Sequence, residues 1–362
     1  MSPTRAARML ALMAIGMDAA LGTASRARGA GRDVSDHAAL SSAAGDILLA
    51  VQPVLASEST IGREAETAAW VGYWQGRDTP EGVALGLALG REVARAVLAA
   101  AAADGAAAAP RTEMQARDQD GAPIAQAPGV WVPTPRLLQP GADPQWGAVR
   151  PLVLPSGAAA RVSPPPVWDS PAFQEVRELF RATQEQLTEA ERAIAWKWDL
   201  RHGTITPVGV WYLIGRDLVL REQLGAAESA RVFAVLGAAI NDAVIACWES
   251  KYHYRVARPV QWMQETGAAH WLPPLIDTPN HPSYPSGHSV ISAASATVLG
   301  RFFPAEAAAL AEQAREASHS RVAGGIHWPI DAEAGLAQGE QVAELVISAL
   351  GLQSASPATR EH

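Results

Sequence analysis

The spacing of apolar residues constrains this chain most, because it follows the helical period nearly everywhere. Apolar side chains recur three and four positions apart through most segments, whereas alternating strand patterns are sparse. The segment that begins near Glu228 and should end near Pro259 is typical. One helical stripe within it comprises Val232, Leu236, Ala239, Ala243 and Cys247. The pattern predicts an all-α protein built as a helical bundle.

Changes in composition along the chain predict five parts. These are an N-terminal segment (1–30), a helical layer (31–105), a wrap (106–168), a helical core (169–352) and a tail (353–362). Glu81–Ala103 is the clearest helix of the layer. The wrap holds twelve of the 26 prolines, so we expect an ordered, non-helical covering loop. Core helices begin with capping signals, as at Ser170 before Pro171 and in a capping box at 188–191.

The first 30 residues have the features of an export signal. Arg5 and Arg8 precede an apolar run from Met9 to Leu21, which only Asp18 interrupts. We expect a signal peptide and therefore an exported protein, periplasmic or secreted, with a disordered N-terminus as the alternative. No later stretch approaches the roughly 20 uninterrupted apolar residues of a membrane span, so we expect none in the mature chain.

Charge and cysteine content exclude several classes of function. The formal net charge of −8 argues against a nucleic-acid partner, since binding to the phosphate backbone needs clustered Lys and Arg. The single cysteine, Cys247, rules out an internal disulfide and a cysteine-based metal site. Any anion bound by this protein must therefore be held by a local cationic site.

A first cationic segment runs from Lys251 to Arg258. If the helix continues, residues seven positions apart lie two turns apart on one face, so both charges can converge on one anion. A solvated basic edge is the simpler interpretation of such a pair taken alone. The chain uses arginine almost exclusively, and its only other lysine is Lys197. A lysine here therefore indicates that a compact point charge is required.

A second segment runs from His281 to His288 and precedes a small-residue, apolar helix that should end near Phe303. Ser286 is a candidate helix cap, and Gly287 lets the backbone approach a ligand closely. Free N–H groups at a helix start favour an anion. His288 lies in that first turn, where it could exchange a proton with the ligand. A capped helix with an incidental histidine is the alternative.

The third segment runs from Ser320 to Asp331. Arg321 offers a planar pair of donors to an oxyanion, and His327 is followed by Asp331, which could hold its other ring nitrogen directly or fix the turn. A buried salt-bridged turn would have the same residues. Six of the nine histidines fall between His253 and His327, and a purely structural segment would not require that concentration.

Taken together and in this order, the three segments resemble the signature of the type 2 phosphatidic acid phosphatase and vanadium haloperoxidase superfamily. The lysine–arginine–proline, proline–serine–glycine–histidine and serine–arginine boxes, the last ending in histidine and aspartate, are all filled between Lys251 and Asp331. The Trp131-Val-Pro-Thr-Pro stretch is similar to secreted bacterial members of the peroxidase branch. The resemblance implies a helical bundle of that type with an N-terminal helical layer.

The resemblance also implies roles for individual residues. His327 would be the axial ligand of vanadate, or the phosphorylated nucleophile of a phosphatase, and His288 the acid–base. The oxyanion would be bound by Lys251, Arg258, Arg321, Ser286 and Gly287. Vanadate is a phosphate analogue that readily becomes five-coordinate, which is why the two branches share one site. The resemblance further implies that Asp199 would steady one of the arginines, since related peroxidases carry an acidic residue on an upstream helix.

Three functions remain open on the sequence. We favour a vanadate-dependent haloperoxidase that uses hydrogen peroxide, a halide and a small organic acceptor, because Trp248 and His281 resemble the peroxidase branch. His281 also favours bromide or iodide over chloride. A soluble acid phosphatase, with no cofactor, is the main alternative. A metal-binding protein using His281, His288, His327 and Asp331 fits less well, because three nearby cations would repel a divalent metal.

Overall fold

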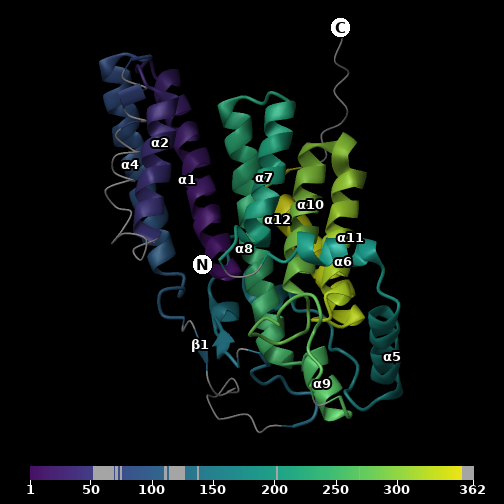
Figure 1. The fold of residues 1–362 in the computed structure, drawn as a ribbon. Helices are drawn as coiled ribbons and strands as arrows, with labels where there is room; N and C mark the ends of the chain where they lie inside the picture. Colours follow the sequence, from purple (N-terminus) through teal and green to yellow (C-terminus); the bar gives the residue numbers. More distant parts are fainter. Residues whose placement is uncertain are drawn as a thin grey trace. The chain divides into compact units, whose positions relative to one another are not determined.

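The computed structural model describes residues 1–51, 69, 72–73, 76–109, 112–113, 127–136, 138–200, 203–268 and 270–352. Helices are the dominant regular structure in this part of the chain, which confirms the all-α prediction (Figure 1). Its helices are α1 (Pro3–Gly29), α2 (Asp36–Val51), α4 (Pro80–Ala102), α5 (Pro171–Glu185), α6 (Glu189–Lys197), α7 (Thr206–Arg221), α8 (Ala226–Tyr254), α9 (Pro259–Glu265), α10 (Gly287–Phe302), α11 (Ala307–Ala323) and α12 (Pro329–Ala349). Two short strands, β1 (Thr112–Glu113) and β2 (Gly141–Ala142), pair antiparallel.

The helices form two compact units whose boundaries differ from the expected parts. One unit comprises Met1–Thr4, Ala108–Trp211 and Ala239–His362, and the other comprises Arg5–Ala107 and Tyr212–Ala238. The stretch 212–238, expected in the core, therefore clusters with the N-terminal helices. The ring of Tyr212 stacks on that of Phe233 at 5.6 Å, which joins the α7 and α8 parts of this second unit.

Within this second unit, α1 packs through small residues. Ala20 and Ala24 belong to one apolar cluster with Val34, Ala39 and Ala43. At Gly237 in α8, an added Cβ would lie 2.8 Å from Cα of Ala11, so this approach requires glycine. Residues 1–30 therefore contain a packed helix, and the disordered alternative does not describe them. Cleavage as a signal peptide stays a prediction.

The charged residues of α1 also have partners in its unit. Arg8 donates from Nε to Asp104 at 2.6 Å. Asp18, which interrupts the apolar run of the sequence, pairs with Arg231 at 3.4 Å. By length and composition, α1 and α8 could each cross a membrane; 44% of the apolar window of α1 and 89% of that of α8 are buried. The burial of α8 is typical of a core helix.

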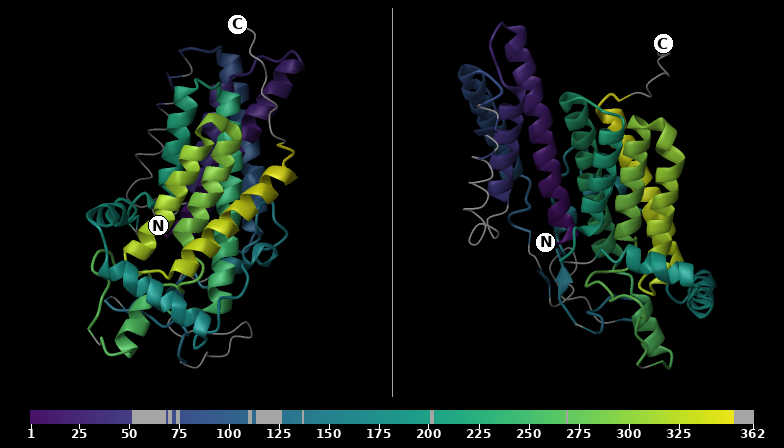
Figure 2. Two further views of the ribbon diagram at one scale, coloured as in Figure 1. Left: turned by 90° about the vertical axis from the view of Figure 1, so that its right-hand side faces the viewer. Right: turned by 45° about the horizontal axis from the view of Figure 1, so that its top comes forward.

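In the other unit, α10 lies between α11 and α12, as the yellow-green helices of Figure 2 show. The backbone of α12 approaches α10 closely at two glycines one turn apart. A Cβ at Gly335 would lie 2.7 Å from the Ser286 carbonyl oxygen, and one at Gly339 would lie 2.3 Å from that of Val290. Glycine at both positions lets α12 pack directly beside the start of α10.

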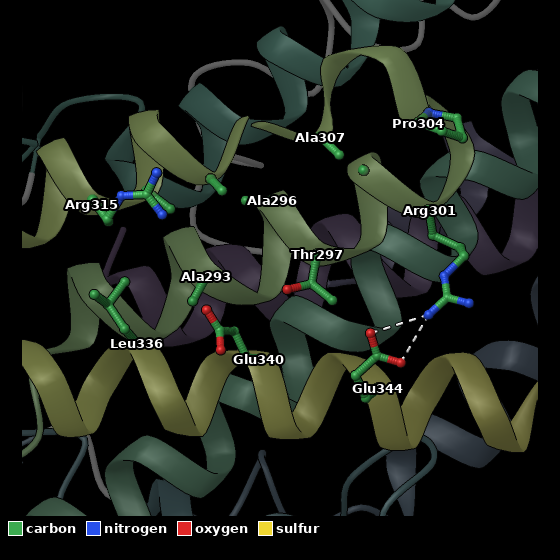
Figure 3. Close-up of a pocket in the computed structure, with 13 residues that line it drawn as sticks. Ala293, Ala296, Thr297, Arg301, Pro304, Ala307, Arg315, Leu336, Glu340 and Glu344 are labelled. Atoms are coloured by element: carbon green, nitrogen blue, oxygen red, sulfur yellow. Dashed lines mark hydrogen bonds and ion pairs between the residues drawn. The ribbon is translucent and has the colours of Figure 1, made fainter. Parts of the chain in front are cut away.

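A groove of about 520 Å³ runs over α10 between α11 and α12 (Figure 3). Alanines such as Ala293 and Ala296 line it, and Arg301 pairs with Glu344 across it at 3.0 Å. None of its lining residues is among the anion-binding residues expected from the sequence. The groove is therefore a separate feature from the site described below.

The described part of the proline-rich wrap is ordered without long helices, with short 3-10 turns at Trp146–Ala148 and Gly157–Ala160. It is held by the helices it covers. The buried carboxylate of Asp242 accepts three backbone N–H groups, from residues 152, 153 and 154, at 2.7 to 2.9 Å. The hydroxyl of Tyr284 donates to the Ser163 carbonyl at 2.8 Å, which ties the wrap to the loop before α10.

Candidate functional site

The first cationic pair converges by a different path from the one expected. Helix α8 ends at Tyr254, and Arg255 has a left-handed φ of 49°, so Arg258 is not on the helix of Lys251. It caps α9 instead, in an extended conformation that the following Pro259 favours. The expectation of one continuous helical face was wrong, yet the chain reversal still brings both cations to one site.

The second segment forms a helix start, as the sequence predicts. Ser286 is the N-cap of α10, and its hydroxyl accepts from the Ser289 N–H at 3.4 Å. Its own N–H donates to the Asp331 carbonyl at 2.8 Å, which joins this helix start to the third segment. A Cβ added to Gly287 would lie 3.6 Å from the Trp248 ring, in ordinary van der Waals contact, so this glycine packs beside Trp248 without being forced by the space.

The third segment places its charged residues on two helices joined by a glycine turn. Arg321 lies near the end of α11, and Gly325 follows with a φ of 77°, a conformation that glycine adopts without strain. His327 and Asp331 then flank the start of α12. The side chains of Arg321, His327 and Asp331 are all buried.

The geometry fixes the proton position on His327. Its Nε2 lies 2.9 Å from Nη1 of Arg258, and its Nδ1 lies 2.8 Å from Oδ2 of Asp331. Arginine can only donate, so Nε2 carries a lone pair and the ring proton sits on Nδ1. Asp331 also accepts the Trp328 N–H at 2.9 Å. Asp331 therefore both holds the second ring nitrogen of His327 directly and fixes the turn, the two roles that the sequence suggested.

The two cations of the first segment are held by carbonyl oxygens. Lys251 donates from Nζ to the carbonyls of Pro282 and Ser283, both at 2.8 Å. Arg258 donates to the His281 carbonyl at 3.0 Å and to the Ile326 carbonyl at 2.6 Å. These bonds orient the charged groups without neutralising them, because a carbonyl carries no net charge.

Arg321 and His288 share an acceptor at the end of α6. The Trp198 carbonyl accepts from Nη1 of Arg321 at 2.7 Å and also from His288. Asp199 is close enough to raise the pKa of Arg321, although burial lowers that pKa overall to about 10. Asp199, which directly follows the end of α6 and does not lie on a helix, is thus electrostatically linked to an arginine of the site.

Burial and mutual repulsion lower the pKa values of the histidines and arginines of the site, which leaves the histidines neutral and the arginines still charged at neutral pH. The pKa of His327 lies well below its ordinary value because of burial, with further lowering by Arg258 and Lys251. Burial likewise lowers the pKa of His288 and His281. It lowers the pKa of Arg258 to about 9, so this side chain remains a cation at neutral pH.

His281 and Trp248 complete one side of the site. The two rings are 5.1 Å apart between centroids, and Nδ1 of His281 lies 3.1 Å from Nη2 of Arg258. The same nitrogen lies 3.3 Å from the Pro282 carbonyl oxygen, so it has both a donor and an acceptor beside it. The indole N–H of Trp248 donates to the Ala142 carbonyl at 3.2 Å, so its ring faces the site through apolar edges alone.

The donor set fits an oxyanion such as vanadate. Among the described residues, Nε of Arg321 and Nε2 of His288 are buried polar atoms without a hydrogen-bond partner. Buried polar atoms are rarely left unpaired, so both are available to a ligand. Nε of Arg321 can donate to it, whereas Nε2 of neutral His288, whose ring N–H is bonded to the Trp198 carbonyl, offers a lone pair. Within the same part of the chain, no group of three or more His, Cys, Asp or Glu residues could hold a metal ion directly.

Two contributors to the site were missed by the sequence interpretation. Ser283 donates from its hydroxyl to Oδ2 of Asp331 at 2.5 Å, and Trp198 contributes only a carbonyl oxygen. Ser283 lies inside the second motif, where its position between two prolines could have drawn attention. A main-chain acceptor leaves no signal in side-chain chemistry.

Comparison with known proteins gives one family and several structures. The model described as "VCPO second helical-bundle domain" matches residues 231–311. A structure described as the first bacterial vanadium-dependent iodoperoxidase is similar at a TM-score of 0.83 and 25% identity, over 96% of this chain and 91% of that one.

Two more distant structures share the fold. The holo form of a bacterial vanadium-dependent chloroperoxidase matches at a TM-score of 0.69 and 14% identity, over 97% of this chain and 93% of that one. The apo form of a bacterial vanadium-dependent chloroperoxidase matches at a TM-score of 0.69 and 16% identity, over 97% of this chain and 94% of that one. No curated protein sequence matches.

Proposed function

We propose that this chain, a member of the vanadium haloperoxidase superfamily, is a vanadate-dependent enzyme that oxidises halide with hydrogen peroxide. One observation carries the proposal: three buried cations surround the Nε2 lone pair of His327, and the unpaired Nε2 of His288 lies in the same site. Bound vanadate would supply the centre at which peroxide becomes able to oxidise a halide by two electrons.

The residues divide this work by charge and proton position. His327 offers the Nε2 lone pair as the ligand, with Asp331 holding the opposite nitrogen. Lys251, Arg258 and Arg321 would balance the anionic charge, and the Ser286 hydroxyl and Gly287 N–H, at the start of α10, would donate to it. His288, neutral because its pKa is lowered, can take a proton from peroxide and return it.

The proposed halide preference is bromide and iodide over chloride. His281 supports it, because its neutral ring fills the wall beside Arg258 where the resemblance suggests an aromatic ring in chloride-oxidising relatives. Greater similarity to an iodoperoxidase than to chloroperoxidases agrees with this preference. Chloride turnover equal to bromide turnover at one pH would exclude it, as would a His281→Phe variant with the halide ratios of the original protein.

A soluble acid phosphatase acting through a phosphohistidine at His327 is the second candidate. The same tautomer supports it, since the Nε2 lone pair that would bind vanadate could also attack a phosphoryl group. His288 would then protonate the leaving alcohol. Phosphate-ester hydrolysis without vanadate, at rates above those of the His327→Ala variant, would favour this function.

The deciding experiment is halide oxidation after incubation with orthovanadate in phosphate-free buffer, using a small organic acceptor as reporter. We expect peroxide-dependent bromination that requires vanadate and disappears on adding excess inorganic phosphate. Phosphate should act competitively, because charge and donor geometry do not distinguish phosphorus from vanadium. Activity that is independent of vanadate, or inhibition by phosphate that is non-competitive, would refute a single oxyanion site.

A further inference from the structure

Ser283 joins all three motif segments through separate atoms. This fully buried residue precedes α10, and its N–H donates to the Val256 carbonyl at 2.9 Å. Its carbonyl accepts from Nζ of Lys251 at 2.8 Å, and its hydroxyl donates to Asp331. Only the last of these bonds depends on the side chain, so a substitution can remove it and leave the other two in place.

The carboxylate of Asp331 is used asymmetrically. Oδ2 accepts three donors, from Ser283 at 2.5 Å, from the Trp328 N–H at 2.9 Å and from Nδ1 of His327 at 2.8 Å. Oδ1 is buried and has no partner. An oxygen that accepts two donors besides His327 cannot also present a hydrogen to Nδ1. In the bond between Asp331 and His327, Oδ2 is therefore the acceptor and Nδ1 the donor, in agreement with the other two donors on the same oxygen.

We propose that Ser283 is a positioning residue: its hydroxyl keeps Oδ2 of Asp331 an acceptor and so keeps the Nε2 lone pair of His327 directed to the oxyanion. The identity of the oxyanion rests on the proposed function, whereas the tautomer of His327 does not. Without the hydroxyl, Asp331 can rotate toward the unpaired Oδ1. The Nδ1–H of His327 then loses a fixed acceptor, so the Nε2 lone pair is no longer held in one direction, while Arg258 still keeps the proton off Nε2.

The test compares Ser283→Ala with a matched control, Ser295→Ala. Ser295 is also fully buried, but its hydroxyl bonds only to the Ile291 carbonyl one turn back in α10. Histidine ring ¹⁵N spectra of the vanadate-free proteins report which nitrogen bears the proton. The His327 signals are assigned by their absence from His327→Gln. Calorimetry with orthovanadate measures the vanadate affinity of each variant, and thermal unfolding measures its stability.

We expect Ser283→Ala to move the Nδ1–H signal of His327 toward that of a more weakly hydrogen-bonded nitrogen and to weaken vanadate binding by about 10- to 100-fold, the usual effect of losing a partner of a ligating histidine. Ser295→Ala should leave the Nδ1–H signal and the vanadate affinity unchanged. An unaltered His327 Nδ1–H signal in Ser283→Ala would overturn the inference, even if the variant is less stable. A shifted signal, together with an original protein that binds no vanadate, would support the inference and refute the proposed function.

Discussion

Nη1 of Arg258 donates to Nε2 of His327 across 2.9 Å, so a cation occupies the lone pair that the proposed cofactor requires. Arginine cannot accept a hydrogen bond, and its position therefore reports the tautomer of the histidine. When Nε2 ligates an anion, this donor becomes free for an anionic oxygen nearby. The same guanidinium can thus protect the ligating nitrogen before binding and balance charge afterwards.

Replacing His327 by alanine should remove vanadate binding and halide oxidation together. The variant loses the Nε2 lone pair that faces Arg258 in the cationic site, and the remaining cations hold the anion by charge alone. We expect the loss of affinity to exceed the roughly 100-fold cost of losing an outer partner of a ligand. Calorimetric titration with orthovanadate measures it, and an unchanged Kd would show that another group is the ligand.

Replacing His288 by alanine should leave vanadate bound but slow turnover. Its Nε2 has no partner and its pKa is lowered, which suits a base that works near neutral pH. Loss of a general acid–base typically costs about 10²- to 10⁴-fold. We expect kcat to fall within that range while the vanadate Kd stays within a few fold of the wild-type value. A large loss of affinity with normal kcat would instead make His288 a binding residue.

Vanadate affinity should fall as pH rises above neutrality because of Lys251. Burial lowers its pKa to about 7, whereas the unfolded chain keeps this proton up to about pH 10.4. The vanadate-free protein therefore gains stability between these values, since the unfolded state binds more protons there, while the site loses a cation.

Lys251→Gln is the control for that pH dependence, because it removes the titrating group and leaves the titration of vanadate itself. Calorimetry between pH 6 and 9 should show the affinity ratio of wild type to Lys251→Gln shrinking as pH rises, by at most about tenfold per pH unit. A ratio that does not change with pH would mean that Lys251 keeps its proton throughout.

Gly335→Ala should disturb the site from outside it. The added methyl would lie 2.7 Å from the Ser286 carbonyl oxygen and from Cβ of Ser289, so α12 must move away from the start of α10. Overpacking of this kind costs about 1–3 kcal/mol, seen as a lower Tm, and should weaken vanadate binding. Gly22→Ala is the control, since its methyl meets only the flexible end of Arg26 at 3.6 Å. Equal Tm values for the two variants would contradict this packing.

Local sequence signals predicted the helix starts accurately. The cap at Ser170 accepts from the Phe173 N–H at 3.2 Å, and the capping box of Thr188 and Glu191 is formed. Ser286 likewise begins α10. These features depend on bonds between residues two to four positions apart, so the order of residues alone contains the information. The same reasoning failed between Lys251 and Arg258, where the left-handed φ of Arg255 ends the helix early.

The sequence by itself determined the all-α class and the residue types that meet at the anion site, because helical periodicity and motif spacing are properties of the chain order. Only the tertiary structure decided how those residues act on one another. The tautomer of His327 depends on Arg258 and Asp331, and the orientation of Asp331 on Ser283, 48 positions away. Hydrogen-bond polarity is a property of atoms in contact, and contacts between distant segments exist only after the helices have packed.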